Sequence, residues 1–254
     1  MEHINKKVNQ VLQQGKTTPE QVTSTPPATK ISQNPSSNKA GTLSPVEGPY
    51  DYEKIFDFLL KKGKQDFGAS FVIQEADKPI ITKLVAYFLK DEFMCLQHKI
   101  SLQKGILLSG PIGCGKTTLM HLMRYFNNQQ QSIYLVKSCR DVSFEFIKEG
   151  YDVVHRYTRQ SYYRNGTNEI PKHYCFDDLG TENNLKYYGN ECNIMAEILL
   201  SRYDQFVAKK LITHLTTNLS ASEIESSYGN RIRSRMREFF NLIAFENSVK
   251  DKRV

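Results

Sequence analysis

Gly110-Pro111-Ile112-Gly113-Cys114-Gly115-Lys116-Thr117 matches G-x-x-x-x-G-K-[ST], the pattern of a phosphate-binding P-loop. The apolar run Ile106–Leu108 precedes it and the helix-compatible run Thr118–Met123 follows, which is the strand–loop–helix setting that the pattern requires. In such a loop, backbone N–H groups turn inward around a phosphate chain, and the next helix points its N-terminus at the same phosphates. A glycine turn that matches by chance would not need these flanking elements. The stretch therefore predicts a nucleotide site.

Individual residues of the loop predict how ATP and Mg²⁺ are held. The Lys116 side chain can reach the β- and γ-phosphates, and the Thr117 hydroxyl can ligate Mg²⁺. The expected contacts with ATP are Gly110, Pro111, Ile112, Gly113, Cys114, Gly115, Lys116, Thr117 and Thr118.

A second motif supplies carboxylates. The apolar-aromatic run His173–Phe176 predicts a buried strand, and Asp177-Asp178 follows directly. At the end of a central parallel strand, Asp177 is expected to hold Mg²⁺ through its water shell, and Asp178 to polarise an attacking water. Aspartate is also common in turns, which is the alternative interpretation of the pair.

Asn218 follows another predicted strand, Leu211–Thr217. This strand is expected beside the aspartate strand, so the Asn218 amide could orient the attacking water. A helix cap or a turn residue is an equally good interpretation of Asn218.

Composition limits the class of protein. The chain has 254 residues and a formal net charge of +7, which permits contact with nucleic acid without requiring it. Its five cysteines lack metal-ligand spacing, so we expect reduced thiols and a cytoplasmic protein. No apolar run approaches the ~18 residues of a membrane span, so no membrane helix is expected.

The order of the predicted elements indicates an α/β fold. Residues 1–48 are polar and low in complexity and are expected to be disordered, whereas 49–254 are expected to form one domain. Helices are expected near 52–60 and at Lys78–Asp91, Val142–Arg159, Asn193–Phe206 and Ala221–Met236. Strands are expected at Ile106–Ser109, Ser132–Val136, His173–Phe176, Leu211–Thr217 and Asn241–Phe245. Such alternation predicts a five-stranded parallel sheet with helices on both faces, a three-layer sandwich.

Two basic segments allow more than one interpretation. Arginines alternate in Arg231-Ile232-Arg233-Ser234-Arg235-Met236-Arg237, which suits a solvated helix face or a cation that stabilises a phosphoryl group held by a neighbouring subunit. Tyr151–Arg164 interleaves four tyrosines with three arginines. It suits either stacking of single-stranded DNA or an amphipathic helix with packed tyrosines.

Taken in order, these motifs resemble AAA+ ATPases, and in particular the DnaC-type helicase loaders and IstB-type transposition helpers. The likeness covers Tyr50–Val254 and rests on the P-loop, Asp177–Glu182, Thr216–Ser220 and Tyr228–Met236. It implies Walker A roles for Lys116 and Thr117 and Walker B roles for the two aspartates. It also implies that Asn218 is a sensor-1 residue, Arg235 an arginine finger with Arg231 as the alternative, and Arg253 a sensor-2 residue. Only nine residues follow Phe245, so the C-terminal helical lid is expected to be absent.

The resemblance implies a function and partners. We expect an ATP-hydrolysing AAA+ protein that acts as a DNA-replication accessory or helicase loader, forms a homo-oligomer through the arginine finger, and meets a replicative helicase. A transposition helper of a mobile element, which would meet a transposase, is the first alternative. A small-molecule phosphotransferase, working as a monomer, is the alternative from a different class.

Overall fold

The computed structural model describes residues 50–126, 133–166, 168–182, 185–187, 190–246 and 251–252. The expected tail at 1–48 and the sensor-2 candidate Arg253 lie outside the described residues.

A parallel five-stranded sheet forms the centre of the domain. Its strands are β1 (Gly105–Ser109), β2 (Tyr134–Ser138), β5 (His173–Leu179), β8 (Thr213–Thr217) and β9 (Phe240–Ala244). They lie in the order β2-β5-β8-β1-β9, and each pair of neighbours is parallel. The five-stranded parallel sheet predicted from the sequence is confirmed. Because β8 separates β1 from β5, the P-loop strand and the aspartate strand are not neighbours in the sheet.

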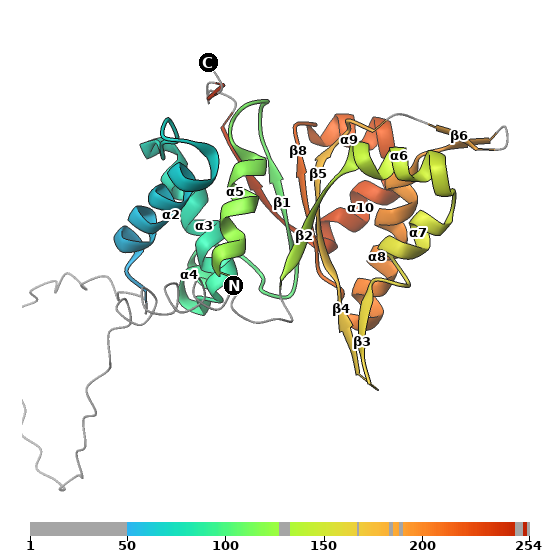
Figure 1. The fold of residues 1–254 in the computed structure, drawn as a ribbon, viewed down its shortest axis with the longest axis horizontal. Helices are drawn as coiled ribbons and strands as arrows, with labels where there is room; N and C mark the ends of the chain where they lie inside the picture. Colours follow the sequence, from blue (N-terminus) through green and yellow to red (C-terminus); the bar gives the residue numbers. More distant parts are fainter. Residues whose placement is uncertain are drawn as a thin grey trace, which may run out of the picture.

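Helices cover both faces of this sheet (Figure 1). Ile106 and Leu108 of β1 face one buried cluster, whereas Leu107 faces the other, as the two-residue period of a strand requires. The first cluster is packed by α2 (Tyr52–Phe67), α3 (Lys78–Leu89), α4 (Glu92–Gln97) and α5 (Lys116–Met123), with short 3₁₀ turns at Glu75–Asp77 and Arg124–Phe126. The second is packed by α6 (Cys139–Glu149), α7 (Asp152–Tyr157), α8 (Ile194–Lys209), α9 (Ala221–Tyr228) and α10 (Asn230–Phe239). The predicted three-layer sandwich is confirmed.

Two of the helices expected from the sequence are each interrupted by a glycine, so the prediction of one continuous helix is wrong in both places. The helix expected over Val142–Arg159 is divided into α6 and α7 at Gly150, which has φ 63° and ψ −144°. The helix expected over Ala221–Met236 is divided into α9 and α10 at Gly229, which has φ 85° and ψ 158°. Both glycines adopt backbone conformations that residues with a Cβ rarely reach, so they end one helix and reorient the next.

Two hairpins were not expected from the sequence. β3 (Tyr162–Asn165) pairs antiparallel with β4 (Asn168–Pro171), and β6 (Leu185–Tyr187) pairs antiparallel with β7 (Asn190–Cys192). The β3–β4 hairpin projects beyond the end of the sheet (Figure 1). Among the described residues, no helix is long and apolar enough to span a membrane.

Candidate nucleotide-binding site

The P-loop connects the end of β1 to the start of α5. Gly113 has φ 78° and Gly115 has φ 98°, so the loop needs residues without a Cβ at both positions. The Gly110 N–H donates to the Thr217 carbonyl at 3.2 Å, which anchors the start of the loop to β8. Helix α5 begins at Lys116, so its free N–H groups face the hollow of the loop.

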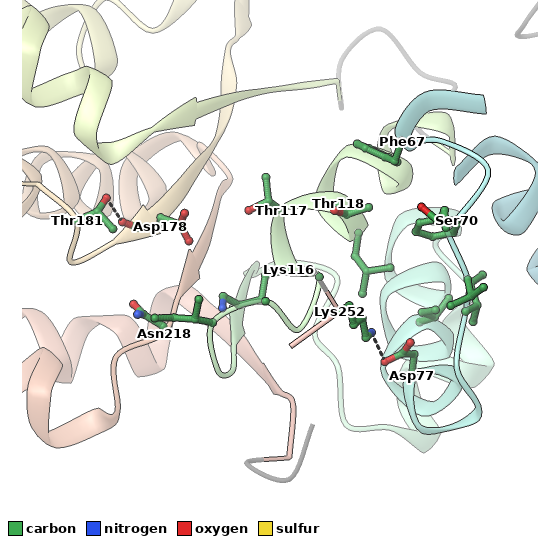
Figure 2. Close-up of a pocket in the computed structure, with 18 residues that line it drawn as sticks. Phe67, Ser70, Asp77, Lys116, Thr117, Thr118, Asp178, Thr181, Asn218 and Lys252 are labelled. Carbon is green, nitrogen blue, oxygen red and sulfur yellow. Dashed lines mark hydrogen bonds and ion pairs between the residues drawn. The ribbon is translucent and has the colours of Figure 1, made fainter. Parts of the chain in front are cut away.

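A pocket of about 460 Å³ lies over this loop. It brings together side chains from distant segments: Lys116, Thr117 and Thr118 from α5, Asp178 from β5, and Asn218 after β8 (Figure 2). The opposite wall is largely apolar and comes from the end of α2, the segment that follows it, and α3: Phe67, Phe71, Val72, Ile73 and Ile81. Polar groups on one side and apolar groups on the other suit a ligand with a phosphate chain and a flat base.

Lys116 is held by the loop itself. Its Nζ donates to the carbonyl oxygens of Gly110 and Pro111 at 2.8 and 2.9 Å, and the side chain is buried. Cys114 is fully buried beneath the loop, and desolvation raises the pKa of its thiol, so it remains protonated near neutral pH. Three of the loop residues expected to contact ATP line the pocket: Ile112, Gly113 and Gly115. Three others belong to the loop but do not line the pocket: Gly110, Pro111 and Cys114.

Thr117 and Asp177 meet beneath the pocket. The Thr117 hydroxyl lies 3.0 and 2.9 Å from the two carboxylate oxygens of Asp177, and the Asp177 side chain is buried. A hydroxyl and a carboxylate are ligands that suit Mg²⁺, which keeps several water molecules and takes further oxygens from phosphates. Among the described residues, no group of three or more His, Cys, Asp or Glu side chains could hold a metal. The Thr117 hydroxyl and the Asp177 carboxylate fit a Mg²⁺ that is held jointly with a nucleotide.

Asp178 lies near the end of β5 and Asn218 directly follows β8, and these two strands are neighbours in the sheet, as expected. Asp178 is half-buried and Asn218 is exposed, and both line the pocket. The helix-cap alternative for Asn218 is wrong. The cap of α9 is Ser220, whose side chain accepts from the Glu223 N–H, while Glu223 in turn accepts from the Ser220 N–H.

Arg235 lies in a different hollow. Its guanidinium is 4.7 Å from the ring centroid of Tyr203 and 3.7 Å from the Asp204 carboxylate. Arg231 and Ser234 line the same hollow, and the P-loop residues do not. The half-buried Arg235 thus lies in a hollow that shares no lining residue with the P-loop pocket of its own chain.

The Tyr151–Arg164 segment is split between two environments. In α7, Tyr157 is buried and donates to Glu145, and Arg156 forms ion pairs with Glu145 and Glu149, which matches the packing alternative. In β3, Tyr163 is 52% exposed, and the Lys172 ammonium lies 4.5 Å from its ring centroid.

Several residues of the pocket belong to none of the sequence motifs. Lys252 enters it from the C-terminal segment and pairs at 2.6 Å with Asp77, whose carboxylate is almost fully buried before α3 (Figure 2). The Lys252 N–H also donates to the Gly113 carbonyl at 3.1 Å. In the sequence, Lys252 stands out only as part of the basic run Lys250-Asp251-Lys252-Arg253. The apolar residues at 67–73 carry no sequence signal for the pocket, because they lie far before the P-loop in the chain.

Comparisons with known proteins concern the fold. The sequence matches no protein-family model and no curated protein. The structure is similar to that of the DnaC helicase loader, with 18% identity, a TM-score of 0.48, and coverage of 70% of this chain and 95% of that one. It is also similar to DnaI, with 15% identity, a TM-score of 0.48, and coverage of 77% and 92%. A third similar structure is AMPPCP-bound DnaA from Aquifex aeolicus, with 16% identity, a TM-score of 0.43, and coverage of 72% and 50%.

One of these proteins, DnaC, is a helicase loader. At identities this low the likeness concerns the fold alone. The function proposed below therefore depends on the geometry of the site.

Proposed function

We propose that this protein binds ATP with Mg²⁺, hydrolyses it slowly, and uses the bound nucleotide to control assembly on a DNA-replication partner. One observation carries the proposal: the Thr117 hydroxyl meets the Asp177 carboxylate at 2.9 Å beneath a pocket that Lys116, Asp178 and Asn218 also line. A cation, two oxygen ligands, a carboxylate base and an amide then converge on the position of a nucleotide's phosphates.

The proposed reaction is hydrolysis of the γ-phosphate. A water molecule attacks the γ-phosphorus, the bond from this phosphorus to the bridging oxygen breaks, and ADP leaves with the electron pair of that bond. Asp178 accepts the proton of the water, and Asn218 orients the water through its amide. Lys116 leaves the carbonyls of Gly110 and Pro111 to meet the phosphates. Bound Mg²⁺ would neutralise charge on the phosphate oxygens, with Thr117 and Asp177 holding it.

The test of this proposal is Lys116→Ala. Loss of a charge-assisted contact with the phosphates should weaken Mg·ATP binding by at least about 10-fold in titration calorimetry. Lys148→Ala, at an exposed position of α6, is the matched control and should bind as the wild type does. Equal affinity of Lys116→Ala and wild type would refute the nucleotide site.

Three roles for a protein with this nucleotide site differ in their partners. A helicase loader should retain a purified replicative helicase in the presence of a nonhydrolysable ATP analogue and release it with ADP. A transposition helper should retain a transposase instead. A small-molecule phosphotransferase should do neither, and its activity per protomer should not depend on concentration. The position of Arg235 in a hollow separate from the P-loop pocket favours the first two roles, because such an arginine can serve a neighbour's site.

We also infer contact with single-stranded DNA at the β3–β4 hairpin. The exposed Tyr163 ring can stack on a base, and Arg164 and Lys172 can meet phosphates. Tyr163→Ala should weaken binding of a fluorescent oligothymidylate about 5- to 100-fold, from the cost of one lost base stack. No change in its anisotropy titration would exclude the hairpin.

A further inference from the structure

The end of β5 contains an irregularity where the two aspartates lie. Phe176 pairs with Leu215, and pairing resumes with Leu179 opposite Thr217. Asp177 and Asp178 therefore face a single residue of β8, Thr216. Asp178 also has φ 57°, in the left-handed region that residues with a Cβ seldom adopt. An inserted residue of this kind leaves the ladder without its ordinary hydrogen bonds and redirects the side chain beside it.

The Thr216 hydroxyl occupies the gap in the ladder. It accepts from the Asp178 N–H at 2.8 Å and donates to Asp177 Oδ1 at 2.7 Å. The side chain is fully buried, and β-branching restricts its χ1, so the oxygen has a fixed position. The carbonyl of Asp178 is held from the other side by the Thr181 hydroxyl at 2.7 Å (Figure 2). One hydroxyl thus supports both aspartates at once.

We propose that Thr216 is a positioning residue of the nucleotide site. It orients the Asp177 carboxylate toward Thr117 and holds the backbone turn that directs Asp178 into the pocket. The inference rests on the proposed ATPase function and adds a residue to which the sequence motif assigns no role. Only a side chain that both donates and accepts can make the two bonds, so serine can replace threonine here and valine cannot.

The experiment compares Thr216→Val and Thr216→Ser with a control, Thr213→Val. Thr213 lies on the same strand, is equally buried, and bonds to Arg202 at the far end of β8. Binding of a nonhydrolysable ATP analogue is measured by calorimetry, once with Mg²⁺ and once with EDTA, and phosphate release is measured separately. The ratio of the two affinities reports the Mg²⁺ contribution, which a general loss of folding would not change selectively.

For Thr216→Val we expect the Mg²⁺ contribution to fall about 10- to 100-fold and turnover to fall at least as much, the range typical of residues that orient a metal ligand. Affinity in EDTA should stay within about 2-fold, since the P-loop contacts are untouched. Thr216→Ser should keep both properties within about 3-fold, because it keeps the hydroxyl. Thr213→Val should lose stability but keep the Mg²⁺ contribution.

Several results would overturn the proposal. One is an unchanged Mg²⁺ contribution in Thr216→Val. Others are an equal loss in Thr213→Val, or failure of serine to restore the Mg²⁺ contribution. If Thr216→Val does not fold, Thr216→Ala, which removes the hydroxyl with less bulk, is measured in its place. A wild-type protein that binds no nucleotide would instead refute the proposed function, and this inference with it.

Discussion

Asp178 combines a strained backbone with a position in the pocket. Its φ of 57° is held by hydrogen bonds to both its amide and its carbonyl, so the neighbours impose the conformation. Among residues with a Cβ, Asp and Asn tolerate this region best. Asparagine is therefore a substitution that can remove the charge of the base while keeping the turn.

We predict that Asp178→Asn binds Mg·ATP within about 2-fold of the wild type, because Thr117 and Asp177 remain. Its turnover should fall about 10²- to 10⁴-fold, the usual contribution of a general base. Calorimetry and phosphate release measure the two properties. Hydrolysis at the wild-type rate would show that another group accepts the proton.

His214 illustrates a buried polar residue with a structural role. Its Nδ1 accepts from the Ile106 N–H at 3.2 Å, and its ring packs among Tyr87, Phe88 and Tyr134. Burial lowers the pKa of His214 to about 3, with a smaller contribution from the charges of His173 and Arg202. The folded protein therefore keeps this imidazole neutral.

The resulting pH dependence has a definite sign. Between pH 6.5 and 3 the unfolded chain binds a proton at His214 that the folded protein does not, so acid favours unfolding. We predict that, because of His214, the free energy of unfolding falls by up to about 1.4 kcal/mol for each unit by which the pH is lowered in this window. His214→Asn, which keeps an acceptor, should show a shallower slope in urea unfolding at pH 4 to 6. Identical slopes would contradict the assignment.

At the scale of elements, the turn between α9 and α10 sets the direction of the arginine-bearing helix. Gly229 has φ 85° and ψ 158°, and, apart from the adjoining parts of the chain, no described atom lies within 4 Å of the position that a Cβ would take. Just before it, Tyr228 donates to Glu182 in the segment that follows Asp178, and that bond ties the turn to the aspartate strand. The conformation of one glycine thus determines where Arg231 and Arg235 lie.

We predict that Gly229→Ala lowers the free energy of unfolding by about 1–3 kcal/mol, because alanine is strained at these angles although its methyl group has room. Ser234→Ala, at an exposed position of α10, is the control and should change it by less than about 0.5 kcal/mol. Chemical denaturation measures both. Equal stability of Gly229→Ala and wild type would mean that the turn can adopt another conformation.

At the scale of the molecule, the P-loop pocket and the Arg235 hollow are separate surfaces of one domain. Arg235 is packed on Tyr203 and lies near Asp204, which restricts the guanidinium before any partner arrives. If the hollow of one protomer faces the pocket of the next, each protomer completes its neighbour's site.

We predict that Arg235→Ala binds ATP as the wild type does but that its turnover rate falls about 10³- to 10⁵-fold, which is the contribution of arginine fingers in general. Mixing it with Lys116→Ala should restore part of the activity, since each variant supplies what the other lacks. Wild-type activity per protomer should rise with protein concentration. No restoration on mixing, together with a flat concentration profile, would favour the phosphotransferase alternative.

Local patterns in the sequence determined the P-loop, the aspartate strand and the alternation of helices and strands. These depend on residues close together in the chain: glycine spacing, apolar runs and their periods. Only the tertiary structure decided which distant residues meet. Thr216 contacts Asp177, which is 39 residues away in the sequence, and Lys252 contacts Asp77, which is 175 residues away. The order of the strands in the sheet and the path of the C-terminal segment place these residues side by side, and local sequence preferences do not. For the same reason, the sequence alone could not show whether Arg156 and Tyr157 pack against Glu145 or form a DNA-binding surface.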